Sequence, residues 1–152
     1  MLAVHWSHVD AVLKQAGDLV GKVILTCSLP MNPNDTALAV AHTSSGAETL
    51  VKKVRNAHVV SAFSTAPSEV LFDVFRRKRR TRRPSLLYCG DDRNAKRIAA
   101  RLIRDVGFEP VDAGPLQVAR YLEPFSLAVA QLAYEGNEGP EIAYRIERFG
   151  KT

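Results

Sequence analysis

Short strand-like segments alternate with segments of helical periodicity along most of this sequence. The strand-like segments lie at residues 23–25, 58–63, 85–89 and 108–112, and the first of them is continuously apolar. A continuously apolar strand that follows a helix is typical of a parallel sheet covered on both faces. The pattern therefore predicts an α/β fold with a mostly parallel sheet, and right-handed crossovers place the helices on both of its faces.

Local signals mark where several of the helices begin and end. Ser45 and Glu48 have the spacing of a capping box, and Gly107 follows the most regular apolar stripe of the chain. Asp91 or Asp92 is expected to cap the helix that carries this stripe. Ser7 is expected to cap a first helix in the same way.

The C-terminal part of the chain is predicted to be helical. Gly114 and Pro115 open a long helix from about Leu116 to Tyr134, which is apolar nearly all round after Pro124. Such a helix is buried in the core or in an oligomer. A final helix is predicted to begin at Pro140.

Composition and length exclude several classes of protein. With 152 residues, of which 46% are hydrophobic and 24% charged, the chain suits one folded domain and not a disordered one. No apolar run is long enough for a membrane span, and the first residues lack the pattern of a signal peptide. Two cysteines, Cys27 and Cys89, exclude a disulfide framework and a four-cysteine zinc site. Buried free thiols and a cytoplasmic location are expected.

The positive charge of the chain is concentrated in one short segment. Between Arg76 and Arg83 lie seven of the 21 basic residues, and without them 14 basic residues face 16 acidic ones. A nucleic-acid-binding domain usually spreads its basic residues over a face of the fold. The segment is therefore predicted to be a solvated loop, with contact to phosphate or nucleic acid as the alternative.

Sequence motifs along nearly the whole chain resemble a known family of oxidoreductases. The motifs are Ala3-Val4-His5-Trp6, Gly21-Lys22-Val23, Leu29-Pro30-Met31-Asn32-Pro33, Ala62-Phe63-Ser64-Thr65, Gly90-Asp91-Asp92, Val111-Asp112-Ala113-Gly114-Pro115-Leu116 and Gln131-Leu132-Ala133-Tyr134. Together they resemble the NADP oxidoreductases that use the deazaflavin coenzyme F(420), with the animal metalloreductases that carry an NADPH-binding domain as distant relatives. The stretch from Asp112 to Leu116 and the helix after it are the most specific parts.

This resemblance implies a Rossmann-type domain that binds NADP and brings the nicotinamide against a flavin-like ring. The implied cofactors are NADP together with coenzyme F(420) or a flavin, and the implied reaction is hydride transfer between them. The protein then positions two rings whose chemistry belongs to the cofactors. This agrees with the sequence, which contains no Ser-His-Asp set and no nucleophile elbow.

The chain also departs from the family in ways that bear on cofactor binding. The family begins with a Gly-x-Gly-x-x-Gly turn that holds the pyrophosphate at a helix N-terminus, and this sequence contains no such motif. It resembles the family from the fourth strand onward, so a truncated or divergent member with impaired cofactor binding is expected. Residues 1–114 would form the C-terminal part of the Rossmann-like domain, and residues 115–152 a helical dimerisation segment.

Ligands of open α/β sheets bind beyond the carboxyl ends of the strands, which directs attention to specific residues. The expected cofactor contacts, all at predicted strand ends, are Val4, Trp6, Leu29, Pro30, Ser64 and Gly114. Trp6 has core packing as an equal alternative, and Thr65 has helix capping. His5 and His8 have the spacing of metal ligands but no evident third ligand, so no metal site is predicted.

A second function from another class stays open. The chain could be a non-catalytic binding or assembly module that contacts nucleic acid or another anion through Arg76 to Arg83. For either function, a homo-oligomer is expected. The apolar helix would form its interface, and the strand ending at Val4, which lacks its usual neighbour, would present an open edge.

Overall fold

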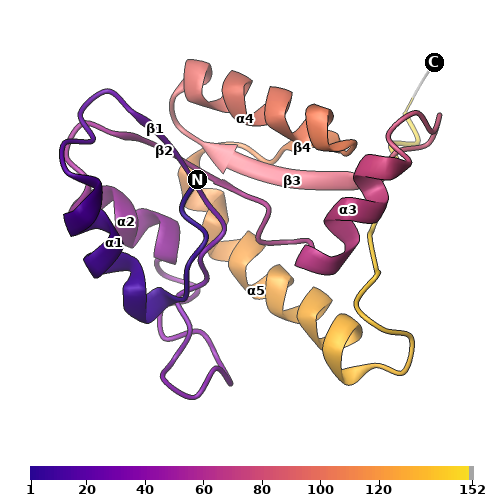
Figure 1. Ribbon diagram of the computed structural model, residues 1–152, viewed down its shortest axis with the longest axis horizontal. Coiled ribbons are helices and arrows are strands. Elements are labelled where there is room, and N and C mark those ends of the chain that lie inside the picture. The colour runs from indigo at the N-terminus through magenta and orange to yellow at the C-terminus, as the bar shows by residue number, and fades with distance from the viewer. Residues whose placement is uncertain (151–152) are drawn as a thin grey trace.

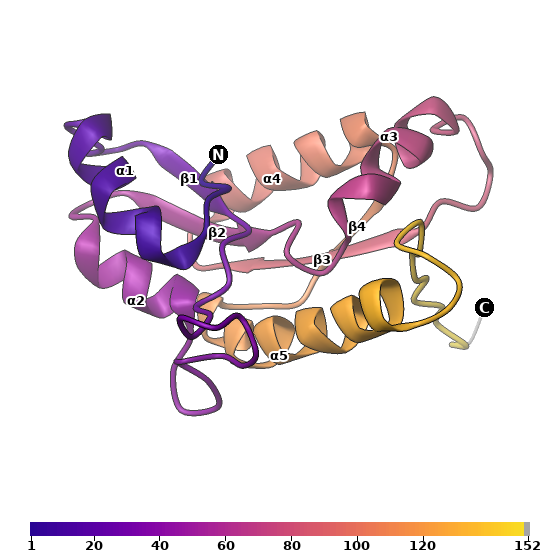
Figure 2. The same cartoon turned by 60° about the horizontal axis from the view of Figure 1, so that its bottom comes forward.

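The computed structural model describes residues 1–150 and contains a four-stranded sheet between two layers of helices (Figures 1 and 2). The strands are β1 (Val23–Thr26), β2 (His58–Ala62), β3 (Ser85–Gly90) and β4 (Glu109–Asp112), in that order across the sheet. Strand β1 pairs in parallel with β2 and β3 with β4, whereas β2 and β3 are antiparallel. Leu2 adds a parallel bridge to Thr26 at the β1 edge. The predicted α/β fold with a mostly parallel sheet is confirmed.

Helices cover both faces of the sheet, as predicted. One face carries α3 (Ser68–Arg76) and α4 (Arg93–Val106), and the other carries α1 (Val9–Ala16), α2 (Gly46–Lys53) and α5 (Ala119–Ala130). Figure 2 shows α4 and α5 on opposite sides of β3. Short 3-10 turns at Trp6–His8 and Leu116–Val118 precede α1 and α5, and a π turn at Gln131–Glu135 follows α5.

The core consists of two hydrophobic clusters that the sheet separates. Neighbouring residues of a strand point to opposite faces, so Val59 joins one cluster and Val60 the other. The cluster beneath α3 and α4 is built around Leu86, Ile103 and Phe108. The cluster beneath α1, α2 and α5 contains Leu2, Val9, Leu50, Leu116 and Leu122.

The capping signals of the sequence act where they were predicted. The Ser45 hydroxyl accepts from the Glu48 N–H at 3.1 Å, the Asp92 carboxylate accepts from the Ala95 N–H at 2.7 Å, and Gly107 ends α4 with φ +113°. The expected cap at Ser7 is wrong, because the ring of His5 accepts from the Ser7 N–H and the chain enters a 3-10 turn first.

The helix predicted to begin at Pro140 is wrong. This segment is extended and docks beside the start of β3, where the Ser85 N–H donates to the Tyr144 carbonyl at 2.8 Å. The Ile146 N–H donates to the Ser85 hydroxyl at 3.0 Å. Hydrogen bonds offered by a buried strand end outweigh the weak helix preference of the local sequence.

Both cysteines carry free thiols, of which Cys89 is buried, as expected, and Cys27 is only half-buried. Burial raises the pKa of Cys89 to about 12.

Within residues 1–150, no helix has both the length and the apolar character needed to cross a membrane.

Candidate functional site

Three parallel segments end side by side at one edge of the sheet. The register aligns Leu2 with Thr26 and Thr26 with Ser61, so the residues after them emerge together. Val4 is tied to the end of β1 because its carbonyl accepts from the Ser28 hydroxyl at 2.7 Å and its N–H donates to the same oxygen at 3.3 Å. Ser64 follows β2 at the same edge.

Five of the six predicted cofactor contacts share this edge. Val4, Leu29 and Ser64 are half-buried, Pro30 is buried, and the half-buried Trp6 lies in the turn that follows Val4. The edge therefore presents apolar side chains next to one hydroxyl. Within residues 1–150, the Ser64 hydroxyl has no hydrogen-bond partner, so it is available to a ligand.

The sixth residue, Gly114, lies at the opposite edge. Strand β3 is antiparallel to β2, with Gly90 opposite Val60, and the Gly90 N–H donates to the Gly114 carbonyl at 3.2 Å. The expectation that Gly114 joins Ser64 at one line of strand ends is wrong. The carboxyl ends of strands meet at one edge only where the strands are parallel, and β2 and β3 are antiparallel.

Backbone strain accompanies the Ser64 position. Phe63 has φ +71°, a conformation that bulky residues rarely adopt, and its side chain is buried. Such strain persists only where the surroundings hold the residue in place, and it is common at functional sites. Here it turns the chain out of β2 directly before Ser64.

The side chain of His5 contacts the loop between β1 and α2. His5 Nε2 lies 2.7 Å from Asp35 Oδ1, and His5 Nδ1 lies 2.7 Å from the Ser7 hydroxyl. The rings of His5 and His8 meet edge to face with centroids 6.0 Å apart. No cluster of three metal-ligating side chains occurs within residues 1–150. The two histidines thus have structural contacts of their own.

Glu123 is the functional-site neighbour that sequence reasoning missed. It is 2% exposed, and its carboxylate accepts from the backbone N–H of Gly46 at 2.8 Å and of Ala47 at 3.0 Å. Burial raises the pKa of Glu123 to about 7, against the opposing effect of these two hydrogen bonds. The sequence signal was a single acidic residue directly before Pro124, where the most apolar part of the helix begins.

The start of α2 therefore lies against both Pro30 and α5. A Cβ atom at Gly46 would come within 2.9 Å of Pro30 Cδ, so only glycine allows this approach. Arg120 of α5 forms a two-pronged ion pair with Glu48, with nitrogen–oxygen distances of 2.9 and 2.7 Å, and this contact lowers the pKa of Glu48. The N-terminus of α2, which would otherwise suit a phosphate, already holds the carboxylate of Glu123.

Thr65 connects the edge to the C-terminal segment. Its hydroxyl lies 2.7 Å from the Tyr144 hydroxyl, which also accepts from the Leu87 N–H at 3.1 Å. The helix-capping alternative for Thr65 is wrong, since Pro67 precedes α3 and no side chain caps it. Burial raises the pKa of Tyr144, so this hydroxyl stays protonated at neutral pH.

A known protein is similar to this chain in sequence. No family model matches the chain. The metalloreductase STEAP3 of Rattus norvegicus is 31% identical over 126 residues, which cover 83% of this chain and 24% of that protein. The chain thus spans about a quarter of the length of this curated relative.

Two solved structures are similar in fold. A candidate F(420)-dependent NADP reductase from Arthrobacter sp. FB24 superposes with a TM-score of 0.82 at 22% identity, over 95% of this chain and 67% of that one. The hypothetical protein SMa0349 from Sinorhizobium meliloti gives a TM-score of 0.63 at 24% identity, over 96% of this chain and 65% of that one. At these identities the likeness concerns architecture, and it agrees with the Rossmann-type α/β fold predicted from the sequence.

Proposed function

We propose that this chain forms the nicotinamide side of an NADP(H)-dependent oxidoreductase, in which hydride passes between NADP(H) and coenzyme F(420) or a flavin. The observation that carries the proposal is the apolar edge beside Ser64, in a fold with a TM-score of 0.82 to a candidate F(420)-dependent NADP reductase. The identity of 31% to a rat metalloreductase supports a redox role independently.

The residues at the edge fit a planar, weakly polar ring. Trp6 and Leu29 would contact the faces of the nicotinamide, and the free Ser64 hydroxyl would bond its carboxamide. Pro30 is less than 2% exposed, so it would support this edge without touching the ring. Val4 would contribute only its side chain, because Ser28 occupies its backbone N–H and carbonyl. NADPH supplies the hydride when bound, so the protein has to orient the ring and exclude water. Gly114 is left out because it lies at the other edge.

The same residues do not fit the pyrophosphate of the cofactor. The sequence has no Gly-x-Gly-x-x-Gly turn, the amides that begin α2 are bonded to Glu123, and Asp92 caps α4. We therefore expect this chain to bind NADPH more weakly than about 100 μM, which corresponds to no more than about 5.5 kcal/mol.

Calorimetric titration with NADPH tests this function. We expect saturable binding that is weaker than about 100 μM and that Ser64→Ala weakens further, by a factor of about 5 to 10 for one lost hydrogen bond. Ser68→Ala is the matched control, because Ser68 is exposed at the start of α3. Low-micromolar affinity would contradict the expected weakness. Absence of saturable binding at millimolar NADPH, or equal effects of the two variants, would reject the site.

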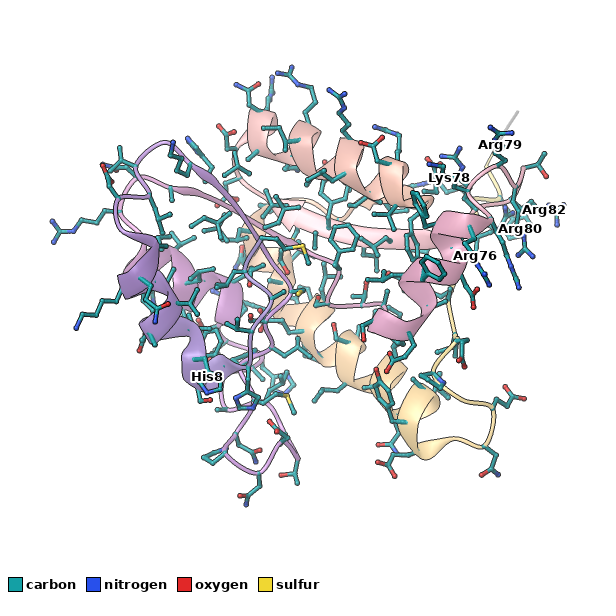
Figure 3. The ribbon with its side chains drawn as sticks, viewed as in Figure 1. His8, Arg76, Lys78, Arg79, Arg80 and Arg82 are labelled. Atoms are coloured by element: carbon teal, nitrogen blue, oxygen red, sulfur yellow. The ribbon has the colours of Figure 1, made fainter. Side chains whose placement is uncertain are left out.

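The alternative function, a binding module for nucleic acid or another anion, rests on the basic residues alone. Figure 3 shows Arg76, Lys78, Arg79, Arg80 and Arg82 gathered at one end of the molecule, where α3 ends. Salt-sensitive binding to unrelated nucleic acids without NADPH affinity would favour this alternative.

A further inference from the structure

A cavity of about 420 Å³ lies between the end of α3 and the extended C-terminal segment. Figure 1 shows the two segments running past each other beyond the end of the sheet. Five arginines line the cavity, four from the basic segment and one from the C-terminal segment: Arg77, Arg80, Arg82, Arg83 and Arg145. Its volume falls in the range of small-molecule sites.

Most of these arginines lack a carboxylate partner. Within residues 1–150, no ion pair involves Arg77, Arg80, Arg82 or Arg83, and Arg145 pairs with Glu147. Two carboxylates, Asp73 and Glu141, also line the cavity, but Asp73 already pairs with Arg76 at 3.3 Å. The cavity lining therefore carries five arginines against two carboxylates, which is an excess of positive charge.

Some residues of the basic segment line the cavity, and others do not. The guanidinium of Arg76 stacks on Phe72 at 5.0 Å, and the ammonium of Lys78 lies 4.2 Å from the centre of the Phe75 ring. Aromatic rings thus contact these two cations, and neither residue lines the cavity. Arg77 and Arg80 line the cavity, and the Arg80 N–H donates to the Arg77 carbonyl at 3.0 Å, which keeps them on one turn.

We propose that this cavity binds the phosphate groups of a small phosphorylated organic molecule, such as a nucleoside diphosphate or triphosphate. The guanidinium fork matches phosphate oxygens in two-pronged contacts, and several unpaired guanidinium groups suit a polyphosphate better than a single carboxylate. Apolar walls from Val70, Val74, Pro84 and Ala143 would accept the uncharged part of the ligand.

The shape of the cavity favours a small molecule over a nucleic acid, because its arginines converge on a concave volume. Exposed basic residues also lie along α4 on the same face of the sheet, at Arg93, Arg97, Arg101 and Arg104, so the test below includes an oligonucleotide. The cavity also adjoins the candidate nicotinamide edge through Tyr144, which lines it and bonds Thr65. The proposed phosphate site does not depend on the proposed redox function.

The test is calorimetric titration of the whole chain with inorganic pyrophosphate and with ATP, at low and at physiological salt. We expect saturable one-to-one binding that weakens as salt rises. The double variant Arg77→Gln, Arg80→Gln should lose at least about tenfold in affinity, the loss expected when two charge-assisted hydrogen-bond donors are removed. Melting temperatures should stay within about 2 °C of the parent, because exposed arginines contribute little to stability.

Arg79→Gln is the matched control, since Arg79 belongs to the same segment but does not line the cavity. Its affinity should stay within about twofold, as expected for a charge screened by solvent. Equal losses in the control and the double variant would mean diffuse attraction and overturn the proposal, as would absence of saturable binding. Tighter binding to a single-stranded oligonucleotide than to ATP, with equal dependence on Arg79, would overturn it in favour of nucleic acid.

A competition titration identifies the source of the phosphate. If NADPH displaces pyrophosphate, the cavity holds the phosphates of a dinucleotide; if both bind together, it serves a separate phosphorylated ligand. Either result keeps the phosphate site. Because Ser64→Ala tests the nicotinamide edge and the arginine variants test the cavity, failure of one proposal leaves the other measurable.

Discussion

Glu123 experiences two opposing influences, since burial disfavours its charge while two backbone donors at the start of α2 favour it. Burial is the larger influence, and the pKa lies at about 7 in the folded chain. The unfolded chain releases this proton at lower pH, near 4.5. The contribution of Glu123 to stability is therefore fully present below about pH 4.5, and it is lost as pH rises toward 7.

This linkage predicts a specific pH dependence. Between pH 4.5 and 7 the free energy of unfolding should fall by up to about 3 kcal/mol because of this one group. In Glu123→Gln that part of the slope should vanish, and urea unfolding at several pH values measures the difference. Glu138→Gln, at an exposed position, is the control and should keep the slope of the parent. Parallel profiles for the parent and Glu123→Gln would contradict the prediction.

Residues that act on near neighbours were predictable, and those that act across the chain were not. Ser45 and Asp92 cap the N–H three positions ahead of them, so a short sequence window contains the whole interaction. Glu123 lies 77 positions from Gly46, and Thr65 lies 79 positions from Tyr144. No local pattern marks such partners, because only the folded sheet brings them together.

Among the elements, the extended C-terminal segment depends on one side chain. The Tyr144 hydroxyl bonds both Thr65 and the Leu87 N–H, and its ring meets Phe125 edge to face at 5.2 Å. Tyr144→Phe keeps the ring but leaves a partly buried N–H and a buried hydroxyl without their partner. We expect a loss of about 1 to 3 kcal/mol in the free energy of unfolding, measured by urea denaturation.

Tyr121→Phe is the control for this change. Tyr121 is 70% exposed, and its hydroxyl has no hydrogen bond within residues 1–150. Its removal should change stability by less than about 0.5 kcal/mol. Equal stabilities for the two variants would show that the segment is held by its backbone contacts to Ser85 alone.

The sequence predicts elements and layers better than it predicts strand direction. A segment one residue longer than the partly exposed β4 predicted the fourth strand. The mainly apolar segments predicted β1 to β3, because burial on both faces leaves such a pattern. The same pattern carries no sign of direction. The antiparallel pairing of β2 and β3 therefore could not be predicted from it. Because of this pairing, Gly114 lies at the opposite edge of the sheet from Ser64. Val4, Leu29, Pro30 and Ser64 lie at one edge because their strands are parallel, and their contact with a cofactor stays a prediction.

For the whole molecule, an exposed apolar stripe on α5 and the π turn after it predicts self-association. Tyr121 and Phe125 are 70% and 37% exposed, and with the exposed Ala128 their spacing of four and three residues places them on one face of α5. Leu132, in the π turn, is 60% exposed and extends the apolar surface. The same spacing forms the seam of paired helices. We expect a homodimer at micromolar concentration, with residues 115–152 supplying the interface, and light scattering measures it.

Charged substitutions separate this interface from other apolar residues. Leu132→Glu should convert the dimer to a monomer, because it would bury an unpaired charge between two helices. Phe72→Glu is the control, since Phe72 is 64% exposed on α3, across the sheet from α5. A monomeric parent chain, or equal dissociation by both variants, would contradict the prediction.

The antiparallel junction between β2 and β3 has a consequence for how freely the chain can be altered. Parallel neighbours require a long crossover, but antiparallel neighbours can be joined by a turn of two residues. The connection between β2 and β3, residues 63–84, is therefore much longer than the geometry of the sheet requires. Lengthening, shortening or exchanging the part after α3 would leave the register of all four strands unchanged, so this is where a transplanted loop would be tolerated and where relatives can diverge in length.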